Sequence, residues 1–354
     1  MIDPRIIKLA NILVNYSVSV KKGDILVINS SSDSAPLALE CYKLALKNRA
    51  YPVVNFSMPG FGYTYYKYAS LQQLKRFPKI AEFEAKQLTC EININAPQNT
   101  REFSNVDPKK IALRRKITRP ISEIILKKRW VGCVYPTNAM AQEADMSLEE
   151  FENFLFNATN RNWKEESKKQ DKLKKVLDKG SRVRIVADDT DISFSIKGRE
   201  ALKCDGKHNM PDGEVFIAPV ETTTDGFIKY TYPTIYGGRE VDGVTLEFKN
   251  GAVVKAKAGK NEGFLKAMLK TDKGAKYLGE FGVGVNYNIN KFIKSILFDE
   301  KIGGTIHLAL GMAYKRGGGK NESALHWDMI KDLKQGGTIY VDHKIIQKNG
   351  KFRL

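Results

Sequence analysis

The sequence predicts a two-domain α/β protein. An N-terminal domain with a doubly wound, mostly parallel sheet precedes a barrel-like, largely antiparallel α+β domain. Apolar runs alternate with helical segments up to about residue 180, and short apolar runs separated by Gly, Asp and Asn turns follow. The length of 354 residues also fits two domains. We therefore assign residues 1–180 to the α/β domain and 181–354 to the second domain.

Strand and helix signals alternate in the first domain. Helical spacing covers 6–14, and the apolar run 25–28 follows a Gly-Asp turn. Ser34 and Pro36 are typical of a helix start, the serine as cap and the proline in the first turn. Further apolar runs predict strands at 51–56, 90–94 and 130–135. Strands separated by helices favour a parallel sheet.

The pattern changes near residue 180. A charged helix is predicted over 148–177, and Lys179-Gly180 is typical of a helix end. Short strands are predicted beyond it at 183–186, 192–196, 215–218, 244–248 and 252–256. Asn250-Gly251 lies between two of these runs and predicts a tight hairpin turn. Closely spaced short strands favour an antiparallel sheet or barrel.

The charge balance is strongly basic, with 58 Lys and Arg against 40 Asp and Glu and a formal net charge of +18. Basic residues are spread along the chain, and the densest stretch, 164–179, is interleaved with acidic residues. No nucleic-acid motif accompanies them, so we expect no specific nucleic-acid partner. No stretch of 18 apolar residues predicts a membrane span, and the start lacks the layout of a secretory signal. We expect a soluble cytoplasmic protein.

Two familiar classes of site are disfavoured. The four cysteines are widely spaced, which favours free buried thiols and leaves any metal to His, Asp and Glu. A dinucleotide-binding loop requires glycines directly after the first strand. The segment in that place, 29–34, contains none. The glycine-rich stretch 317–320 is followed by Asn321 in place of Ser or Thr, so it is no phosphate loop.

Histidines are few, with four in the whole chain. His326 lies two residues before Asp328, and in an extended chain such side chains share a face and can meet at one ion. His307 lies inside an apolar run predicted to be a strand. Taken singly, the His326–Asp328 pair also fits an exposed surface pair, and His307 also fits a core residue.

Two glutamates lie in unusual settings. Glu214 begins a predicted strand, and Glu280 is flanked by glycines and apolar residues. A buried carboxylate is costly unless it is paired or bound to metal, although each glutamate also fits an exposed turn. Tyr314, before a glycine-rich loop, also fits a packing residue. Together with Asp328 and two histidines they supply six oxygen and nitrogen donors, which suit two ions of zinc, cobalt, manganese or magnesium.

Four motifs occur in order in the second half of the chain. They are NMPDGEVF at 209–216, LGEFG at 278–282, TIHLALG at 305–311 and SALHWD at 323–328. This set resembles the metal-dependent aminopeptidases of the aminopeptidase T and aminopeptidase S type, first known from thermophiles. The segment 135–147 resembles the N-terminal domain of that family. The similarity therefore spans nearly the whole chain.

The resemblance implies a metalloaminopeptidase with two divalent ions per subunit, held by the domain 181–354. The implied ligands are Glu214, Glu280, His307, Tyr314, His326 and Asp328. The family's fold is an α/β domain followed by a barrel-like domain, as the residue patterns also predict. Its members form homodimers whose active sites face an internal cavity, so the expected partners are a second subunit and peptides with a free N-terminus.

The implied mechanism uses a water activated by the two cations to attack the scissile carbonyl. Glu280 is the candidate bridging carboxylate, and a carboxylate at the water could carry its proton to the leaving amine. Tyr314 would either ligate a cation or stabilise the oxyanion. His208 and Asp212, close to Glu214 in sequence, are candidates to support it, with exposed turn residues as the alternative.

Two other functions fit parts of the sequence. The first is a different dinuclear hydrolase on the same metal core, such as an amidase or a phosphoesterase. A phosphoesterase favours several arginines near the ligands, and Lys315-Arg316 is the one basic pair that qualifies. The second is a non-catalytic, basic protein associated with nucleic acid.

Overall fold

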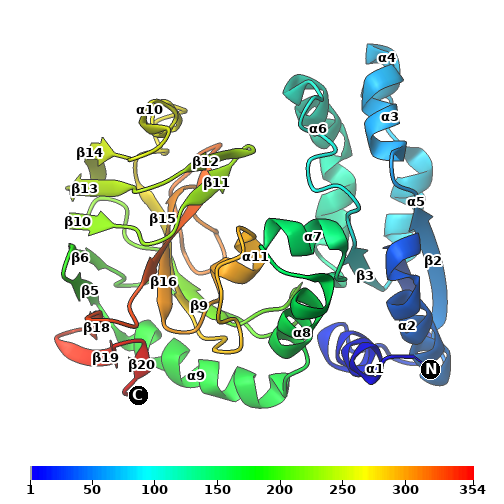
Figure 1. The fold of residues 1–354 in the computed structure, drawn as a ribbon, viewed down its shortest axis with the longest axis horizontal. Helices are drawn as coiled ribbons and strands as arrows, with labels where there is room; N and C mark the ends of the chain where they lie inside the picture. The colour runs from blue at the N-terminus through cyan, green and yellow to red at the C-terminus, as the bar shows by residue number, and fades with distance from the viewer. Residues whose placement is uncertain (1) are drawn as a thin grey trace. The chain divides into compact units, whose positions relative to one another are not determined.

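The computed structural model describes residues 2–354, and the chain forms two compact units (Figure 1). The first unit runs to Arg161 and takes in Gly206–Pro211. The second unit consists of Asn162–Asp205 and Asp212–Leu354. The sequence boundary after residue 180 assigns helix α9 (Trp163–Lys179) to the first domain, whereas its contacts lie with the second unit.

The first unit contains a five-stranded parallel sheet in the order β2-β1-β3-β4-β8. Its strands are β1 (Ile25–Ser31), β2 (Tyr51–Ser57), β3 (Cys90–Asn95), β4 (Arg129–Val134) and β8 (Asn209–Met210). Four of the five follow predicted apolar runs. The fifth, β8, reaches the sheet from far along the chain, where Gly132 pairs with Asn209. The predicted parallel α/β architecture is confirmed.

Helices precede and separate these strands. They are α1 (Pro4–Asn11), the π-helix η1 (Ile12–Ser17), the 3-10 helix η2 (Ser32–Ser34), α2 (Ala35–Lys47), α3 (Phe61–Tyr68), α4 (Leu71–Lys75), α5 (Lys79–Gln87), α6 (Pro108–Ile125), α7 (Asn138–Glu143) and α8 (Leu148–Thr159). Helix α2 begins where predicted, but Ser34 does not cap it. The Ser34 hydroxyl instead accepts a hydrogen bond from the Ser31 backbone, because it belongs to a preceding turn.

The helix predicted over 148–177 is two helices. Helix α8 ends at Thr159, and α9 begins at Trp163 after Asn162, whose side chain caps it by accepting from Glu165 N. The Asn162 side chain satisfies an N–H group in the first turn of α9 that has no partner within the helix. Helix α9 ends at Lys179 as predicted, with Gly180 in an extended conformation. A Cβ on Gly180 would lie 2.4 Å from the Val341 side chain, so the glycine serves packing here.

The second unit contains two larger antiparallel sheets and a two-stranded ribbon. The eight-stranded sheet has the order β14-β13-β10-β6-β5-β18-β19-β20, and the five-stranded sheet has the order β17-β16-β15-β9-β7. Their strands are β5 (Arg182–Ala187), β6 (Thr190–Ser195), β7 (Leu202–Cys204), β9 (Glu214–Ile217), β10 (Asp225–Lys229), β13 (Thr245–Lys249), β14 (Ala252–Lys257), β15 (Leu278–Gly284), β16 (Thr305–Gly311), β17 (His326–Asp332), β18 (Thr338–Val341), β19 (Lys344–Lys348) and β20 (Lys351–Phe352). The ribbon pairs β11 (Thr234–Tyr236) with β12 (Arg239–Val241), and the short helices are α10 (Glu262–Met268) and α11 (Ile296–Asp299).

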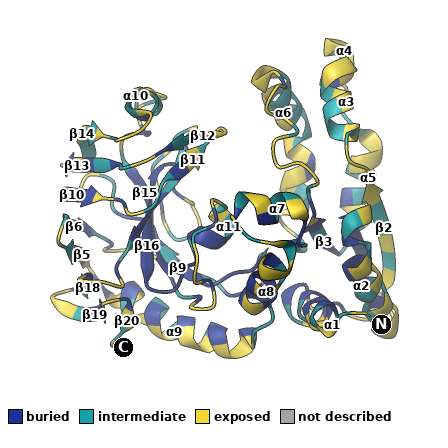
Figure 2. Cartoon of the chain, viewed as in Figure 1, coloured by how far each residue is buried: buried dark blue, intermediate teal, exposed yellow. Residues whose placement is uncertain are grey.

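A single apolar core fills the second unit. Phe194 of β6 and Phe281 of β15 meet edge to face, with ring centroids 5.2 Å apart, so the two sheets pack against each other. Every residue of β15 and of β16 is buried (Figure 2). Because side chains alternate along a strand, the central strands also bury their face opposite this core.

The predicted hairpin at Asn250-Gly251 is confirmed. Both residues have positive φ, 50° and 85°, as a tight turn between antiparallel strands requires. A Cβ on Gly251 would lie 1.9 Å from the Glu221 carbonyl oxygen, so no larger residue fits. Among residues 2–354, no helix is both long and apolar enough to cross a membrane.

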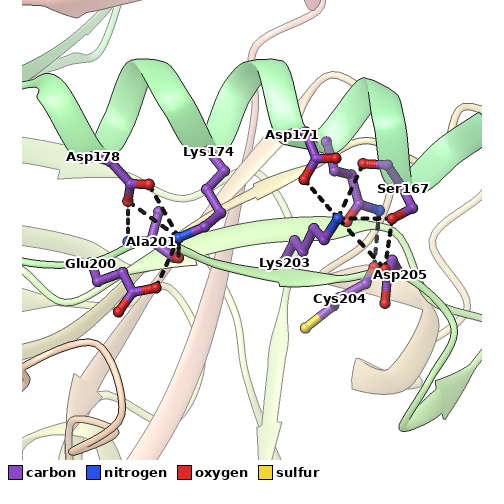
Figure 3. Close-up of polar contacts among 10 residues, drawn as sticks. Ser167, Asp171, Lys174, Asp178, Glu200, Ala201, Lys203, Cys204 and Asp205 are labelled. Carbon is purple, nitrogen blue, oxygen red and sulfur yellow. Dashed lines mark hydrogen bonds and ion pairs between the residues drawn. The ribbon is translucent and has the colours of Figure 1, made fainter.

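Two lysines join helix α9 to strand β7 through the polar contacts of Figure 3. Lys203 Nζ donates to Asp171 Oδ1 at 2.6 Å and to Ser167 Oγ at 2.8 Å. Lys174 Nζ donates to the Ala201 carbonyl at 2.6 Å. Strand β7 in turn pairs with β9, where Cys204 lies opposite Glu214. The helix thus anchors the strand beside a predicted ligand.

Candidate metal centre

The predicted ligands gather on one face of the five-stranded sheet. Phe281, Trp327 and other residues of alternate positions point into the core. The intervening side chains therefore lie on the opposite face. Those of the predicted ligands are Glu214 on β9, Glu280 on β15, His307 on β16, and His326 and Asp328 on β17. Period-two alternation on four neighbouring strands is what brings these five residues together.

His307 lies at the centre of the group. Its side chain is fully buried, and its Nε2 lies 3.2 Å from Glu280 Oε1 and 3.2 Å from Glu214 Oε2. Its Nδ1 lies 3.2 Å from the Glu300 carbonyl oxygen. The backbone carbonyl accepts from Nδ1 when this nitrogen carries the proton, which leaves the Nε2 lone pair directed at the two carboxylates.

Glycine at position 282 makes room for this imidazole. Gly282 lies opposite His307 across the β15–β16 pair. A Cβ at Gly282 would lie 2.0 Å from both Cε1 and Nε2 of His307. The ring therefore covers the backbone of β15 and can reach Glu280 only because the intervening residue has no side chain.

His326 and Asp328 share a face of β17, as the extended-chain prediction requires. His326 Nε2 lies 3.5 Å from Asp328 Oδ2, and His326 Nδ1 lies 2.8 Å from the Met312 carbonyl oxygen. Ala309 on β16 lies opposite Asp328 and also opposite Glu280 on its other side. The small alanine leaves the two carboxylates facing the same space.

Three buried carboxylate oxygens at this place have no hydrogen-bond partner among the described residues. They are Glu214 Oε2, Glu280 Oε2 and Asp328 Oδ1. One unsatisfied buried polar atom already costs about 1–3 kcal/mol. Ligand atoms of Glu280, His307 and Asp328 all lie within 4.8 Å of one another. Oxygen and imidazole donors at this spacing, with lone pairs left over, fit a divalent cation.

The ionisation of these groups is strongly perturbed. Burial raises the pKa of Glu214 and of Glu280, and it raises the pKa of Asp328 to about 6. Burial alone would lower the pKa of His307, but the hydrogen bond to Glu280 and the charge of Glu214 raise it to about 10. The cluster therefore needs positive charge, which protons or a metal ion can supply.

Comparison with known proteins identifies the family. The model of the thermophilic metalloprotease family (M29) matches residues 2–352. This chain belongs to the M29 thermophilic metalloprotease family. Membership confirms the resemblance and implies that a divalent metal is used, and it favours a hydrolase over a non-catalytic nucleic-acid-associated protein.

Relatives of this M29 metalloprotease carry aminopeptidase names. Aminopeptidase 2 of Geobacillus stearothermophilus is 28% identical over 87% of this chain and 83% of its own length. Aminopeptidase AmpS of Bacillus subtilis is 26% identical over 96% of this chain and 92% of its own. The structure of wild-type AmpT from Thermus thermophilus superposes with a TM-score of 0.87 over 99% of both chains, at 18% identity. This last match confirms the two-domain α/β fold.

Tyr314 lies at the edge of the candidate metal centre. Its ring is 5.5 Å from the His326 ring and 5.7 Å from the Phe216 ring. Burial and the nearby charges, Glu280 first among them, raise the pKa of its phenol. About half of the residue is exposed, 47%, so it adjoins the solvent side of the cluster.

The two proposed supporting residues lie in different surroundings. His208 stacks on Trp130 with ring centroids 4.7 Å apart, and it belongs to the first unit. Asp212 is almost fully buried, and one of its carboxylate oxygens lies within 4.8 Å of donor atoms of Cys204 and Glu214. Of the two, Asp212 is the one the structure brings beside a predicted ligand.

Sequence reasoning missed two neighbours of the site, Glu300 and Lys301. Donor atoms of Glu214, Glu300 and His307 lie within 4.8 Å of one another. The Lys301 ammonium contacts Glu300 Oε1 and lies 3.6 Å from Glu214 Oε1. A lysine between helix α11 and an apolar strand gives no sequence signal of burial, because lysine is rarely buried.

Proposed function

We propose that this chain is a metalloaminopeptidase that removes N-terminal residues from peptides at a dinuclear metal site. The observation that carries the proposal is the set of three buried carboxylate oxygens around His307 that make no hydrogen bond to any described residue, in a member of a metalloprotease family. The relatives named as aminopeptidases support the reaction class. The ligands we assign are Glu214, Glu280, His307, Tyr314, His326 and Asp328.

When bound, the divalent ions supply Lewis acidity and an activated water at neutral pH. The residues of the chain orient the ligands and move protons. The backbone carbonyls of Glu300 and Met312 hold the His307 and His326 imidazoles. Glu280, central among the carboxylates, is the candidate to bridge the ions, and a carboxylate here can carry a proton to the leaving amine.

Chelation is the first test. We expect hydrolysis of a leucyl arylamide to cease in excess chelator and to return on addition of cobalt, zinc or manganese. An N-acetylated peptide is expected to be inert, because its capped nitrogen can neither ligate a cation nor pair with a carboxylate. Undiminished hydrolysis in chelator contradicts the metal mechanism, and equal turnover of capped and free peptides indicates an endopeptidase or an amidase.

Glu280→Gln tests the assigned ligand. The amide keeps the volume but removes a charge and a strong donor oxygen, so we expect loss of at least one metal and a fall in kcat of about 10³-fold. Glu262→Gln is the matched control, because Glu262 lies on α10 in an exposed pair with Lys266. Metal content, circular dichroism and arylamide turnover are measured. Full metal content with near-normal turnover of Glu280→Gln would place the site elsewhere.

Tyr314→Phe separates the two roles of the tyrosine. If the Tyr314→Phe variant, which lacks the hydroxyl, also loses a metal ion, Tyr314 is a metal ligand. Full metal content with a reduced kcat assigns it as a hydrogen-bond donor to the oxyanion.

We also infer a cytoplasmic location. All four cysteines are free thiols, as a reducing compartment favours.

A further inference from the structure

Lys301 is the one fully buried lysine beside the candidate metal centre among residues 2–354. It follows helix α11, and the Asn286 N–H donates to its carbonyl at 3.0 Å. None of its side chain is exposed. A buried ammonium is costly unless it is paired, so its partners must account for its place.

Those partners are acidic side chains of the site. The ammonium contacts Glu300 Oε1 and lies 3.6 Å from Glu214 Oε1. Glu214 is 5% exposed, and the Glu300 side chain is 17% exposed. The carboxylates of Glu214 and Glu300 resemble a cation-binding site. The ammonium of Lys301 supplies the cation.

The same carboxylates could also hold a metal ion. Donor atoms of Glu214, Glu300 and His307 lie within 4.8 Å of one another, as do those of Glu280, His307 and Asp328. The two triads share His307 and differ in one respect. The first is in contact with a lysine through Glu214 Oε1, whereas its Glu214 Oε2 makes no hydrogen bond within residues 2–354. In the second, Glu280 Oε2 and Asp328 Oδ1 also make no hydrogen bond in this range.

We propose that Lys301 is a built-in cation that occupies the place of a further divalent ion between Glu214 and Glu300. It thereby confines bound metal to the side of Glu214 Oε2, Glu280, His307 and Asp328. This inference rests on the proposed function, since it assumes that metal binds at that second triad. Lys301 is a positioning residue, because it acts through Glu214 and touches no reacting atom.

Lys301→Ala tests the proposal by metal stoichiometry. The variant removes the ammonium and leaves space between the buried carboxylate of Glu214 and the partly buried carboxylate of Glu300. We expect Lys301→Ala to bind one more manganese or zinc ion per subunit than the unchanged protein, as counted by mass spectrometry of the elements after dialysis. Its unfolding temperature should also rise more on addition of manganese.

Lys331→Ala is the matched control. Lys331 is buried and contacts Asp189, so this variant also removes a buried lysine from a carboxylate. We expect it to keep the metal content of the unchanged protein. The double variant Glu300→Gln/Lys301→Ala removes both charges and is expected to return to that same metal content.

The outcomes separate the two proposals. Unchanged stoichiometry and an unchanged manganese response of Lys301→Ala overturn this inference and leave the proposed function standing. Absence of metal from the unchanged protein under all conditions overturns the proposed function. If Lys301→Ala does not fold, folding of the double variant supports the charge balance. Failure of both variants, with Lys331→Ala folded, shows that Lys301 acts by packing and overturns the inference.

Discussion

Small residues of the central strands lie beside the predicted ligands. Gly282 lies under the His307 imidazole, and Ala309 lies between Glu280 and Asp328. Larger side chains at these two positions would fill the space in which the donor atoms face one another. The predicted ligands therefore require small side chains at Gly282 and Ala309.

Gly282→Ala tests this dependence. The new Cβ would lie 2.0 Å from His307 Nε2, so the imidazole must move. We expect a lower metal content, a fall in activity of about 10²-fold and a loss of stability of about 1–3 kcal/mol.

Gly263→Ala on helix α10 is the control, since a Cβ there meets no atom within 4 Å. Alanine in a helix should leave activity unchanged and add up to about 1 kcal/mol of stability. Normal metal content of Gly282→Ala would mean that His307 does not depend on this glycine. Element analysis and thermal unfolding measure both variants.

Asp299 gives a prediction for pH. Burial raises its pKa to about 7 from the ordinary 3.8, although the Ile293 N–H donates to its carboxylate at 2.8 Å. The folded protein therefore binds more protons than the unfolded chain between about pH 4 and 7, and stability falls as pH rises through this window. Asp299→Asn cannot ionise and keeps an acceptor oxygen.

We expect Asp299→Asn to gain stability relative to the unchanged protein on going from pH 5 to pH 8. The gain should be on the order of 2 kcal/mol, since one pKa unit corresponds to about 1.4 kcal/mol. Denaturant unfolding of both proteins in chelator at the two pH values measures it. A constant difference between them would show that Asp299 does not titrate in this range.

Elements of the second unit place the predicted ligands through strand register. Strand β17 puts His326 and Asp328 on one face because they are two residues apart, and this could be predicted from sequence. The pairing of Cys204 with Glu214 could not be predicted from sequence, because no local pattern indicates the three-residue strand β7. Helix α9 holds that strand by the two lysines of Figure 3.

Lys203→Met tests the junction of α9 and β7. Lys203 donates to Asp171 and to Ser167, and hydrogen bonds to charged groups contribute about 1.5–3 kcal/mol each, less where they are partly exposed. We expect a loss of stability of about 1–2 kcal/mol in denaturant unfolding. Lys255→Met is the control, because the Lys255–Glu247 pair is exposed and 3.9 Å apart, and its stability should hardly change. Equal stability of the two variants would contradict an anchoring role.

At the scale of the whole molecule, the first unit exposes large apolar side chains. Phe61, Tyr68, Ile80 and Phe83 on α3 and α5 are between 67% and 86% exposed. Exposed apolar residues on neighbouring elements are typical of interaction surfaces. The family resemblance described under Sequence analysis implies the same expectation for this chain.

We predict a homodimer, which should sediment at about twice the mass of the 39.9 kDa chain. Analytical ultracentrifugation at the concentration of the activity assay measures it, and moderate salt limits non-specific association of a chain with net charge +18. An active monomer at that concentration would contradict this prediction.

The sequence by itself determined the class of fold and predicted the residues of the candidate site. Strand and helix periods predicted the parallel sheet and the antiparallel second domain, since burial imposes them locally. Four motifs singled out Glu214, Glu280, His307, His326 and Asp328, and the family resemblance added Tyr314. The break between α8 and α9 was missed, because a cap at Asn162 outweighed the continuing helical pattern.

Only the tertiary structure decided how the site is completed. Glu300 and Lys301 reach it because the chain after α11 lies beside His307, and a sequence pattern carries no such contact. The return of Gly206–Pro211 to the parallel sheet also depends on a strand pairing of distant residues. Local periodicity follows from burial of one face of an element, so it can be read from the sequence. Contacts between distant residues depend on how the buried faces pack against one another, and that packing is set only when the whole chain folds.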